Sequence, residues 1–135
     1  MRRPERPKRP AYLALMVAIC LAACGGSESS NEGLESAFAE GRSAVWVDGY
    51  GTVVRELVST GSEQRFQVRI NDGLTIVLLR DTDAASPITA SQGDRISFHG
   101  RYDFHGGGGT VSRIHPDPTQ PGGGGWVEVN GVRQD

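Results

Sequence analysis

Apolar and polar positions divide the chain into a short continuous apolar run and a longer region of alternation. The continuous run extends from Ala11 to Leu21, roughly half of the twenty or so apolar residues that a bilayer-spanning helix needs. After a polar stretch, most apolar residues alternate with polar ones, which is typical of half-buried β-strands. The pattern therefore predicts a β-rich domain that follows a short apolar leader.

Five segments have the pattern expected of strands, and a sixth predicts a closing hairpin. The predicted strands are residues 44–57, 65–70, 74–80, 95–105 and 110–115, and the hairpin is residues 126–133. Asn71-Asp72-Gly73 separates the second strand from the third and is typical of a tight turn. Gly49 and Gly51 interrupt the first strand, which predicts a bulge or a sharp coil there.

The alternation is clearest at residues 95–105. Successive side chains of a strand point to opposite faces, so the apolar set is expected to face the core. That set is Ile96, Phe98, Gly100, Tyr102 and Phe104, and the polar set is Arg95, Ser97, His99, Arg101, Asp103 and His105.

One short amphipathic helix is predicted before the first strand, at residues 32–41. Its markers are Leu34, Ala37 and Phe38 at helical spacing, Ser29 and Glu32 as a capping box, and Gly41 as the stop. With this helix and five main strands, the sequence predicts an all-β fold, a small Greek-key barrel of OB type. An open β-sandwich is the alternative, because periodicity does not distinguish the two.

The leader has the features of an export signal. Basic residues precede the apolar run, and Leu21-Ala22-Ala23-Cys24-Gly25 closes it. This closing motif resembles the lipobox of bacterial lipoproteins, which implies that residues 1–23 are removed and that acyl chains on Cys24 hold the domain at a membrane. Gly25 in place of aspartate implies the outer membrane, on its periplasmic side. The alternative is an ordinary signal peptide whose removal leaves Cys24 as a free thiol.

Removal of the leader changes the charge of the chain. Five of the 14 basic residues and one of the 16 acidic residues lie in residues 1–23, so 9 basic and 15 acidic residues remain, with a net charge of −6. No lysine remains, which disfavours nucleic acid as a partner because such binding depends on neutralised phosphates. Cys20 lies in the leader, so Cys24 has no cysteine to pair with. Residues 24–31 are predicted to be a flexible linker, and residues 32–135 one packed domain.

Several segments together resemble one bacterial family. They are GYGTVVREL (49–57), QRFQVRI (64–70), GLTIVLL (73–79), QGDRISFHGRYDF (92–104), IHPDP (114–118), and GGW (124–126) followed by NG (130–131). In this order they resemble an uncharacterised family of exported bacterial OB-fold-like domains, domain of unknown function 3465. The resemblance implies an OB-like fold and carries no established activity with it.

The chain departs from the pattern of that family at several histidines. Family members carry histidines where this chain has Glu63 and Arg80, and a His-His-Asp-Pro run where it has a single His115. Their closing Tyr-Gln also differs, since Arg133 precedes Gln134 here. If the histidines of the family form a metal or catalytic site, the resemblance implies that most of that site is missing in this chain.

His115 and Asp117 are the most suggestive pair for chemistry, since a histidine beside a carboxylate can ligate a metal or act as an oriented base. A zinc site needs three or four ligands, and Asp103 and His105 are the other candidate ligands. His99 stands about 20 Å from His105 along one strand, so these two cannot share an ion. Both are interpreted as members of a solvated sheet face.

The direction of His115 depends on how residues 110–115 pair with residues 95–105. With residues 106–109 as the whole loop, Ser112 lies opposite Asp103, and His115 falls on the apolar face. A bulge of one residue would instead turn Ile114 inward and His115 outward. The bulge is favoured because it buries Ile114.

The sequence contains no recognisable catalytic set, which favours a non-enzymatic binding or interaction module without a cofactor. The expected binding surface is the outer face of the strands within residues 66–80 and the nearby loops, for an anionic or carbohydrate ligand. Its expected ligand-binding residues are Arg65, Arg69, Arg101, His115 and Asp117. The expected partners are the membrane, through the lipid, and an unidentified periplasmic ligand or envelope protein. The alternative function is a metal-dependent or hydrolytic domain that uses His115 and Asp117.

Aromatic residues offer a further binding surface. Trp46, Tyr50, Tyr102 and Trp126 could stack against single strands or sugars, as aromatic residues of OB folds do. The favoured alternative places Tyr102 in the core and Trp126 as a cap on the barrel.

Overall fold

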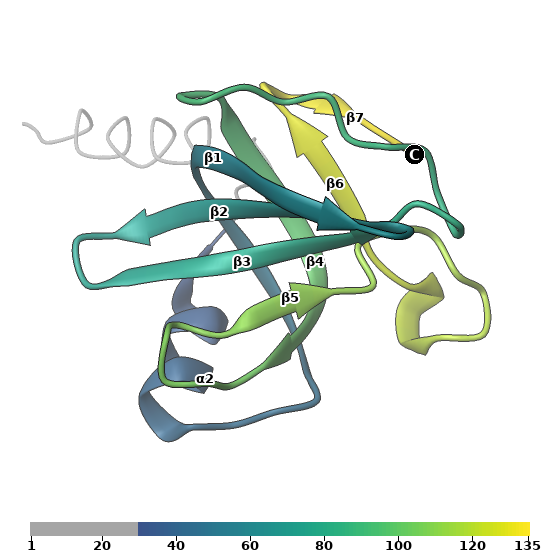
Figure 1. Ribbon diagram of the computed structural model, residues 1–135. Coiled ribbons are helices and arrows are strands. Elements are labelled where there is room, and N and C mark those ends of the chain that lie inside the picture. The colour runs from purple at the N-terminus through teal and green to yellow at the C-terminus, as the bar shows by residue number, and fades with distance from the viewer. Residues whose placement is uncertain (1–29) are drawn as a thin grey trace, which may run out of the picture.

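The computed structural model describes residues 30–135, which form one helix, seven strands and a short 3-10 helix (Figure 1). The signal peptide, Cys24, most of the linker and Ser29 of the capping box lie outside these residues, so what the sequence says of them stays a prediction. The elements are α2 (Glu32–Glu40), β1 (Val45–Thr60), β2 (Glu63–Asn71), β3 (Leu74–Asp81), β4 (Arg95–Asp103), β5 (Thr110–Ser112), η2 (Pro121–Gly123), β6 (Trp126–Val129) and β7 (Val132–Arg133).

Five of these strands close into a barrel. β1, β2, β3, β5 and β4 are neighbours in that order, and β4 pairs again with β1. β3 and β5 are parallel, whereas the other neighbours are antiparallel. This is the order of a Greek-key barrel of OB type, so the predicted fold is confirmed, and the β1–β4 pairing distinguishes it from an open sandwich. β6 and β7 extend the sheet outward from β4.

β1 is long enough to pair with two other strands of the barrel. Its first half pairs with β4 and its second half with β2. Its two register shifts lie between Val53 and Arg55 and between Leu57 and Thr60, and not at Gly49 and Gly51, where the sequence predicted a bulge. Pairing with β4 is regular at both glycines. A Cβ on Gly49 would overlap the ring of Phe98, so close packing explains this glycine.

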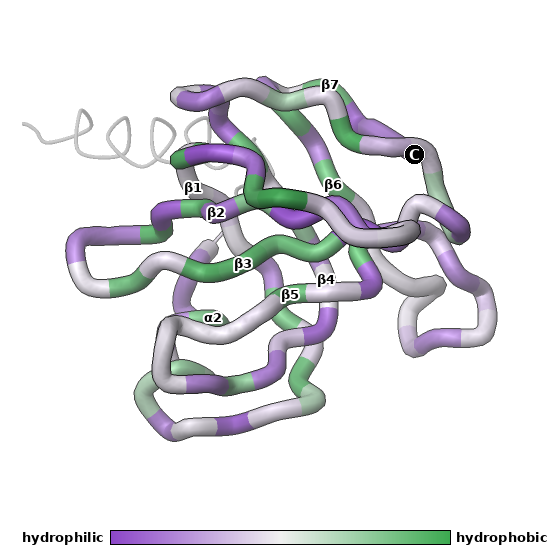
Figure 2. Tube along the Cα trace, viewed as in Figure 1, coloured by the Kyte–Doolittle hydropathy of each residue, from purple (hydrophilic) through white to green (hydrophobic). Residues whose placement is uncertain are grey.

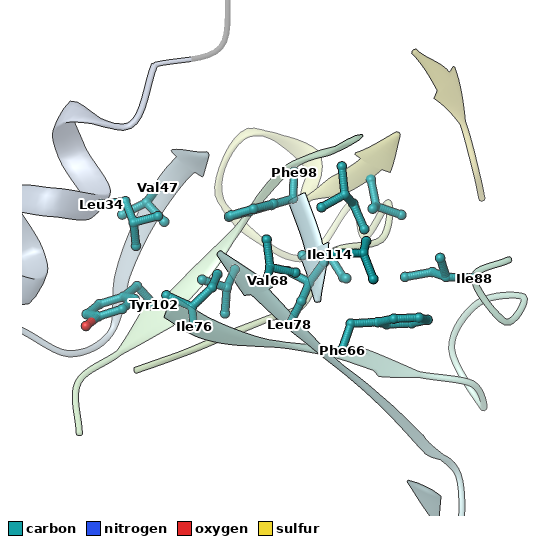
Figure 3. Packing of buried hydrophobic residues seen from close by; sticks show 14 of the residues in the cluster. Leu34, Val47, Phe66, Val68, Ile76, Leu78, Ile88, Phe98, Tyr102 and Ile114 are labelled. Atoms are coloured by element: carbon teal, nitrogen blue, oxygen red, sulfur yellow. The ribbon is translucent and has the colours of Figure 1, made fainter. Parts of the chain in front are cut away.

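The core is built from alternate side chains of the strands, as the sequence predicted (Figure 3). β3 is a hydrophobic stretch across the barrel (Figure 2), along which buried and half-buried side chains alternate. Leu34 of α2 lies at one end of the cluster and Ile88 at the other (Figure 3). Tyr102 is fully buried, and its hydroxyl donates to the carbonyl oxygen of Gly108 at 2.8 Å. This burial raises the pKa of the phenol.

Phe104 and His105 do not continue the alternation of β4, which the sequence extended to residue 105. The strand ends at Asp103, because the backbone N–H of Phe104 donates to the hydroxyl of Ser43 at 2.9 Å and the chain turns away. Phe104 is 39% exposed and packs against Phe38 of α2, with 5.8 Å between the ring centroids.

The helix begins after Asn31, whose side chain binds β1 and does not cap the helix. The Asn31 amide donates to the carbonyl oxygen of Tyr50 at 3.1 Å and accepts from the N–H of Tyr50 at 2.8 Å. Asn31 thus bonds both backbone groups of Tyr50, which lies in the part of β1 that pairs with β4 and not with β2. Gly41 ends the helix in the left-handed region, with a φ of 66°, as the sequence predicted.

The register between β4 and β5, which the sequence left open, differs by two residues from the simple pairing that puts Ser112 opposite Asp103. Ser112 pairs with Arg101, and Asp103 pairs with Thr110. The connecting loop is therefore residues 104–109, since the early end of β4 adds two residues to it.

A left-handed residue takes the place of the bulge predicted after β5. Arg113 has a φ of 57°, which reverses the alternation of inward and outward side chains. Ile114 is fully buried as a consequence, as predicted, and His115 is half-buried.

Candidate functional site

One outer face of the sheet carries half-buried aromatic side chains and an exposed carboxylate from three strands. The alternation of β4 turns His99 outward. The pairing places Asp48 of β1 on one side of it and Trp126 of β6 on the other. Trp46 lies two residues before Asp48, on the same face of β1. We call Trp46, Asp48, His99 and Trp126 the aromatic face.

His99 is fixed by two contacts with β1. Its Nδ1 lies 2.7 Å from Oδ1 of Asp48, and its ring stacks on Trp46 with 5.5 Å between centroids and 26° between planes. With the carboxylate as acceptor, Nδ1 carries the proton and Nε2 is left to bond a ligand. The side chain of His99 is 27% exposed, so a ligand on this face can reach it.

Trp126 continues the aromatic face toward the end of the chain. Trp126 pairs directly with His99. The guanidinium of Arg133, on β7, lies 4.6 Å from the centroid of the Trp126 ring. Arg133 is also bonded to Glu128 at 3.0 Å, so a hairpin ion pair holds the cation over the indole. Trp126 therefore lies on the outer sheet face and does not cap the barrel, which corrects the favoured interpretation of its sequence.

Arg101 borders the aromatic face on β4. It is the next outward residue after His99 and lies between Trp46 of β1 and Ser112 of β5. Its Nε is buried without a hydrogen-bond partner in residues 30–135. The nearest carboxylate oxygen belongs to Asp103, 3.8 Å away.

The three arginines predicted to bind a ligand lie on two strands. Arg65 and Arg69 are on β2, where Arg65 is bonded to Glu63 at 2.8 Å and Arg69 to Asp72 at 2.5 Å. Their charges are therefore neutralised locally. Of the three, Arg101 is the one that adjoins the aromatic face.

His115 and Asp117 lie in the loop between β5 and β6, where their polar groups shape the chain. Oδ1 of Asp117 accepts from the hydroxyl of Thr119 at 2.7 Å and from its N–H at 3.0 Å. The hydroxyl bond first, then the backbone bond, lower the pKa of Asp117. The carbonyl oxygen of His115 accepts from Gly125 at 2.9 Å, whereas its Nδ1 is buried without a partner among the described residues.

The candidate metal ligands do not converge. Nε2 of His105 lies 3.1 Å from Oγ1 of Thr110, and Oδ1 of Asp103 accepts from the N–H of Ala44 at 3.0 Å. Within residues 30–135, no three His, Cys, Asp or Glu side chains are grouped so that they could hold a metal ion.

A family model described as "Protein of unknown function (DUF3465)" matches residues 15–135. The chain belongs to this family. Among solved structures, the DUF3465 chain is similar to a chain of the S. pombe Stn1–Ten1 complex, with 11% identity and a TM-score of 0.47. That match covers 62% of this chain and 57% of the other. No curated protein matches the chain.

Arg80 is a fully buried cation at the end of β3, which the sequence identified only as a departure from the DUF3465 pattern. Its Nε donates to the carbonyl oxygen of Ser86 at 2.8 Å, its Nη1 to Ile114 at 2.7 Å and its Nη2 to Gln134 at 3.1 Å. Desolvation lowers the pKa of this guanidinium. Arg80 thus joins the loop after β3, the exit of β5 and the end of the chain.

A groove of about 490 Å³ lies on the outside of the DUF3465 barrel, where β1 changes its partner from β4 to β2. Apolar and polar groups both line it, and Arg69 at its edge is paired with Asp72. Its lining residues are Thr52, Val53, Val54, Arg69, Ile70, Asn71, Gln92 and Gly93.

Among residues 30–135, no helix has the length and apolar character needed to cross a membrane.

Sequence reasoning named both tryptophans but missed their relation to Asp48 and His99. The available signal was the alternation of side chains. Trp46 and Asp48 fall on one face of the first predicted strand, and His99 falls on the polar face of the fourth. What joins them is the β1–β4 pairing, a contact between distant segments that local periodicity does not contain.

Proposed function

We propose that this DUF3465 protein is a lipid-anchored, non-enzymatic binding module of the bacterial envelope that holds carbohydrate against its aromatic face. The observation that carries the proposal is the position of the two tryptophans of the chain. Both lie on one outer sheet face, next to a histidine that an aspartate orients.

Carbohydrate fits the chemistry of this face. A sugar ring presents apolar C–H groups on its faces and hydroxyls around its edge, and indole rings supply flat apolar area with little conformational entropy to lose. Nε2 of His99 and the exposed carboxylate of Asp48 lie beside Trp46 and can bond those hydroxyls. OB folds bind oligosaccharides through the face of strands 2 and 3 and the nearby loops, whereas the aromatic face lies on β1, β4 and β6. The net charge of −6 after leader removal disfavours nucleic acid.

A binding role suits His99 better than a catalytic one. An oriented histidine can act as a general base, but a nucleophilic mechanism also needs a hydroxyl or thiol within hydrogen-bond reach of the ring. The side-chain hydrogen bond of His99 runs to Asp48. The pair is therefore assigned to the recognition of ligand hydroxyls.

The envelope address rests on the leader and on Cys24. The proposed linker reaches the barrel at Asn31, which binds the backbone of Tyr50 on β1. β1 also carries Trp46 and Asp48, so the tether would join the domain at a strand of the aromatic face. In cells, Cys24→Ser is expected to abolish incorporation of labelled palmitate and to release the protein from membranes. Unchanged labelling and unchanged membrane fractionation of this variant would refute the anchor.

Carbohydrate binding can be followed without any label, because both tryptophans belong to the proposed site. Titration of residues 25–135 with a panel of neutral and acidic oligosaccharides is expected to change the intrinsic fluorescence in a saturable manner. Trp46→Phe and Trp126→Phe each leave a single reporter and keep an aromatic ring, so both variants are expected to respond.

Binding by the alanine variants is measured by calorimetry. Trp46→Ala and Trp126→Ala are each expected to weaken binding by roughly tenfold, by analogy with the gain of about 1–3 kcal/mol that a nucleic-acid base makes by stacking on an aromatic side chain. Phe104→Ala serves as the control, because Phe104 is an exposed aromatic residue that packs on Phe38 outside the aromatic face. If no oligosaccharide of the panel binds, or if both tryptophan variants bind like the parent, the carbohydrate proposal is wrong. A stoichiometric transition metal in the purified protein would instead favour the metal-dependent alternative.

A further inference from the structure

We infer that the sugar bound by the aromatic face carries a negative charge and that Arg101 is the residue that binds this charge. The inference rests on the proposed function and extends it from carbohydrate in general to anionic carbohydrate. It depends on where Arg101 lies and on what its guanidinium lacks.

Arg101 is placed to meet a group attached to a ring on Trp46. The two residues are direct partners across β1 and β4, and both point to the outer face. His99 is the preceding outward residue of β4, at about 7 Å along the strand, a span comparable to one sugar ring. A ring that stacks on Trp46 and bonds His99 would therefore place its next substituent at the guanidinium.

The guanidinium of Arg101 is poorly satisfied within the described part of the chain. Its Nε is buried without an acceptor, and the nearest carboxylate oxygen, Oδ2 of Asp103, is 3.8 Å away, beyond hydrogen-bond distance. The other oxygen of Asp103 is already bonded to the N–H of Ala44 at 3.0 Å. The side chain of Arg101 is nevertheless 37% exposed, so a ligand can approach its terminal nitrogens.

The other charged side chains of the face have closer hydrogen-bond partners. Asp48 is bonded to His99 at 2.7 Å, and Glu128 is bonded to Arg133 at 3.0 Å. Arg101 is the cation beside Trp46 and His99, and its contact with the Asp103 carboxylate, at 3.8 Å, is the longest of these pairs. A planar guanidinium bonds carboxylate and phosphate groups with two parallel N–H donors, so an oxyanion on the sugar would supply the missing acceptor.

The test compares ligands that differ in charge. The parent protein is titrated with a neutral glucose oligosaccharide, with a glucuronate-containing oligosaccharide of the same length, and with a phosphorylated one. Binding of a charged ligand is expected to be at least tenfold tighter than binding of the neutral ligand, and this preference is expected to weaken as salt is added. A preference for the glucuronate ligand alone would identify a uronic acid as the source of the charge, and a preference for the phosphate ligand alone a sugar phosphate.

Variants of Arg101 test the residue itself. Arg101→Gln is expected to abolish the preference and to leave affinity for the neutral ligand within about twofold. Arg101→Lys keeps the charge but not the planar fork, so it is expected to keep part of the preference. Arg65→Gln is the control, because Arg65 is bonded to Glu63 on β2 and should not affect the preference.

The outcomes separate this inference from the proposed function. Equal binding of neutral and charged ligands, or an unchanged preference in Arg101→Gln, would overturn the role of Arg101 and leave carbohydrate binding intact. Absence of binding by every ligand would overturn both. Circular dichroism of each variant shows whether a lost preference reflects lost folding, and Arg101→Lys decides the matter if Arg101→Gln does not fold.

Discussion

Nδ1 of His99 lies 2.7 Å from Oδ1 of Asp48, although the two residues are 51 positions apart in the chain. The closing pair of the barrel, β1 with β4, brings them together as direct partners. The same closure sets Trp46 against the His99 ring. A change that breaks the hydrogen bond without disturbing the strands therefore tests the site separately from the fold.

Asp48→Asn is expected to weaken ligand binding and to leave stability almost unchanged. The amide keeps the shape of the side chain but loses the charge that orients the imidazole, so His99 is held less firmly for a ligand. A loss of roughly tenfold in affinity is expected, since tenfold corresponds to about 1.4 kcal/mol. Because Asp48 is 59% exposed, the free energy of unfolding should change by less than about 1 kcal/mol. Fluorescence titration and urea unfolding measure the two quantities, with Asp72→Asn on the β2–β3 turn as the control.

The sequence was sufficient for the strands and for most of the core, because both follow from local alternation. Phe66, Val68 and Ile96 are buried as their parity predicts. Predictions that required the relation between distant segments were less successful. The fourth strand was extended two residues too far, because the bond from Phe104 to Ser43 ends β4 earlier than alternation indicates.

Burial of Arg80 also depends on contacts between distant segments. Arg80 lies at an inward position of an apolar strand, although arginine is seldom fully buried. Three carbonyl oxygens from separate segments satisfy it, and none of them is recognisable from residue types. The candidate site is similar. Alternation predicts which strand face carries each residue of the aromatic face, but the contacts between these residues depend on closure of the barrel.

Arg80→Met is expected to be strongly destabilising. Methionine fills much of the volume but leaves buried carbonyl oxygens without donors, and each unsatisfied buried group costs about 1–3 kcal/mol. The free energy of unfolding should fall by about 3 kcal/mol or more. Arg80→Lys should lose less, because an ammonium keeps some of the bonds. Arg42→Ala is the matched control, since Arg42 is exposed and paired with Glu40. Equal stability of the Met variant and this control in chemical denaturation would contradict the structural role.

Gly100→Ala is expected to destabilise the barrel through close packing. A Cβ at this position would overlap the carbonyl oxygen of Ser112 and approach the side chains of Ile114 and Val111. Overpacking of this kind costs typically about 1–3 kcal/mol. Gly106→Ala is the control, because nothing lies within 4 Å of a Cβ there. Thermal unfolding followed by circular dichroism should show a lower midpoint for the first variant alone.

Acid is expected to destabilise the protein partly through Asp94 and Asp117. Hydrogen bonds lower the pKa of both carboxyl groups below the ordinary value of 3.8, from Ser91 and then Asn130 for Asp94, and from Thr119 for Asp117. A carboxyl whose pKa is lower in the folded state adds stability that is complete above 3.8 and is lost as the pH falls through the folded pKa.

The free energy of unfolding should therefore decrease as the pH is lowered from neutral to about 2. Asp94→Asn and Asp117→Asn remove the titrating groups, so each variant should be less stable at neutral pH and should lose less stability on acidification. Asp83→Asn, in the loop after β3, serves as the control, since the Asp83 side chain accepts none of these bonds. Urea unfolding at a series of pH values measures the effect. If the curves of the parent and of the Asp94 and Asp117 variants run parallel down to the lowest pH, then these hydrogen bonds do not couple folding to proton binding.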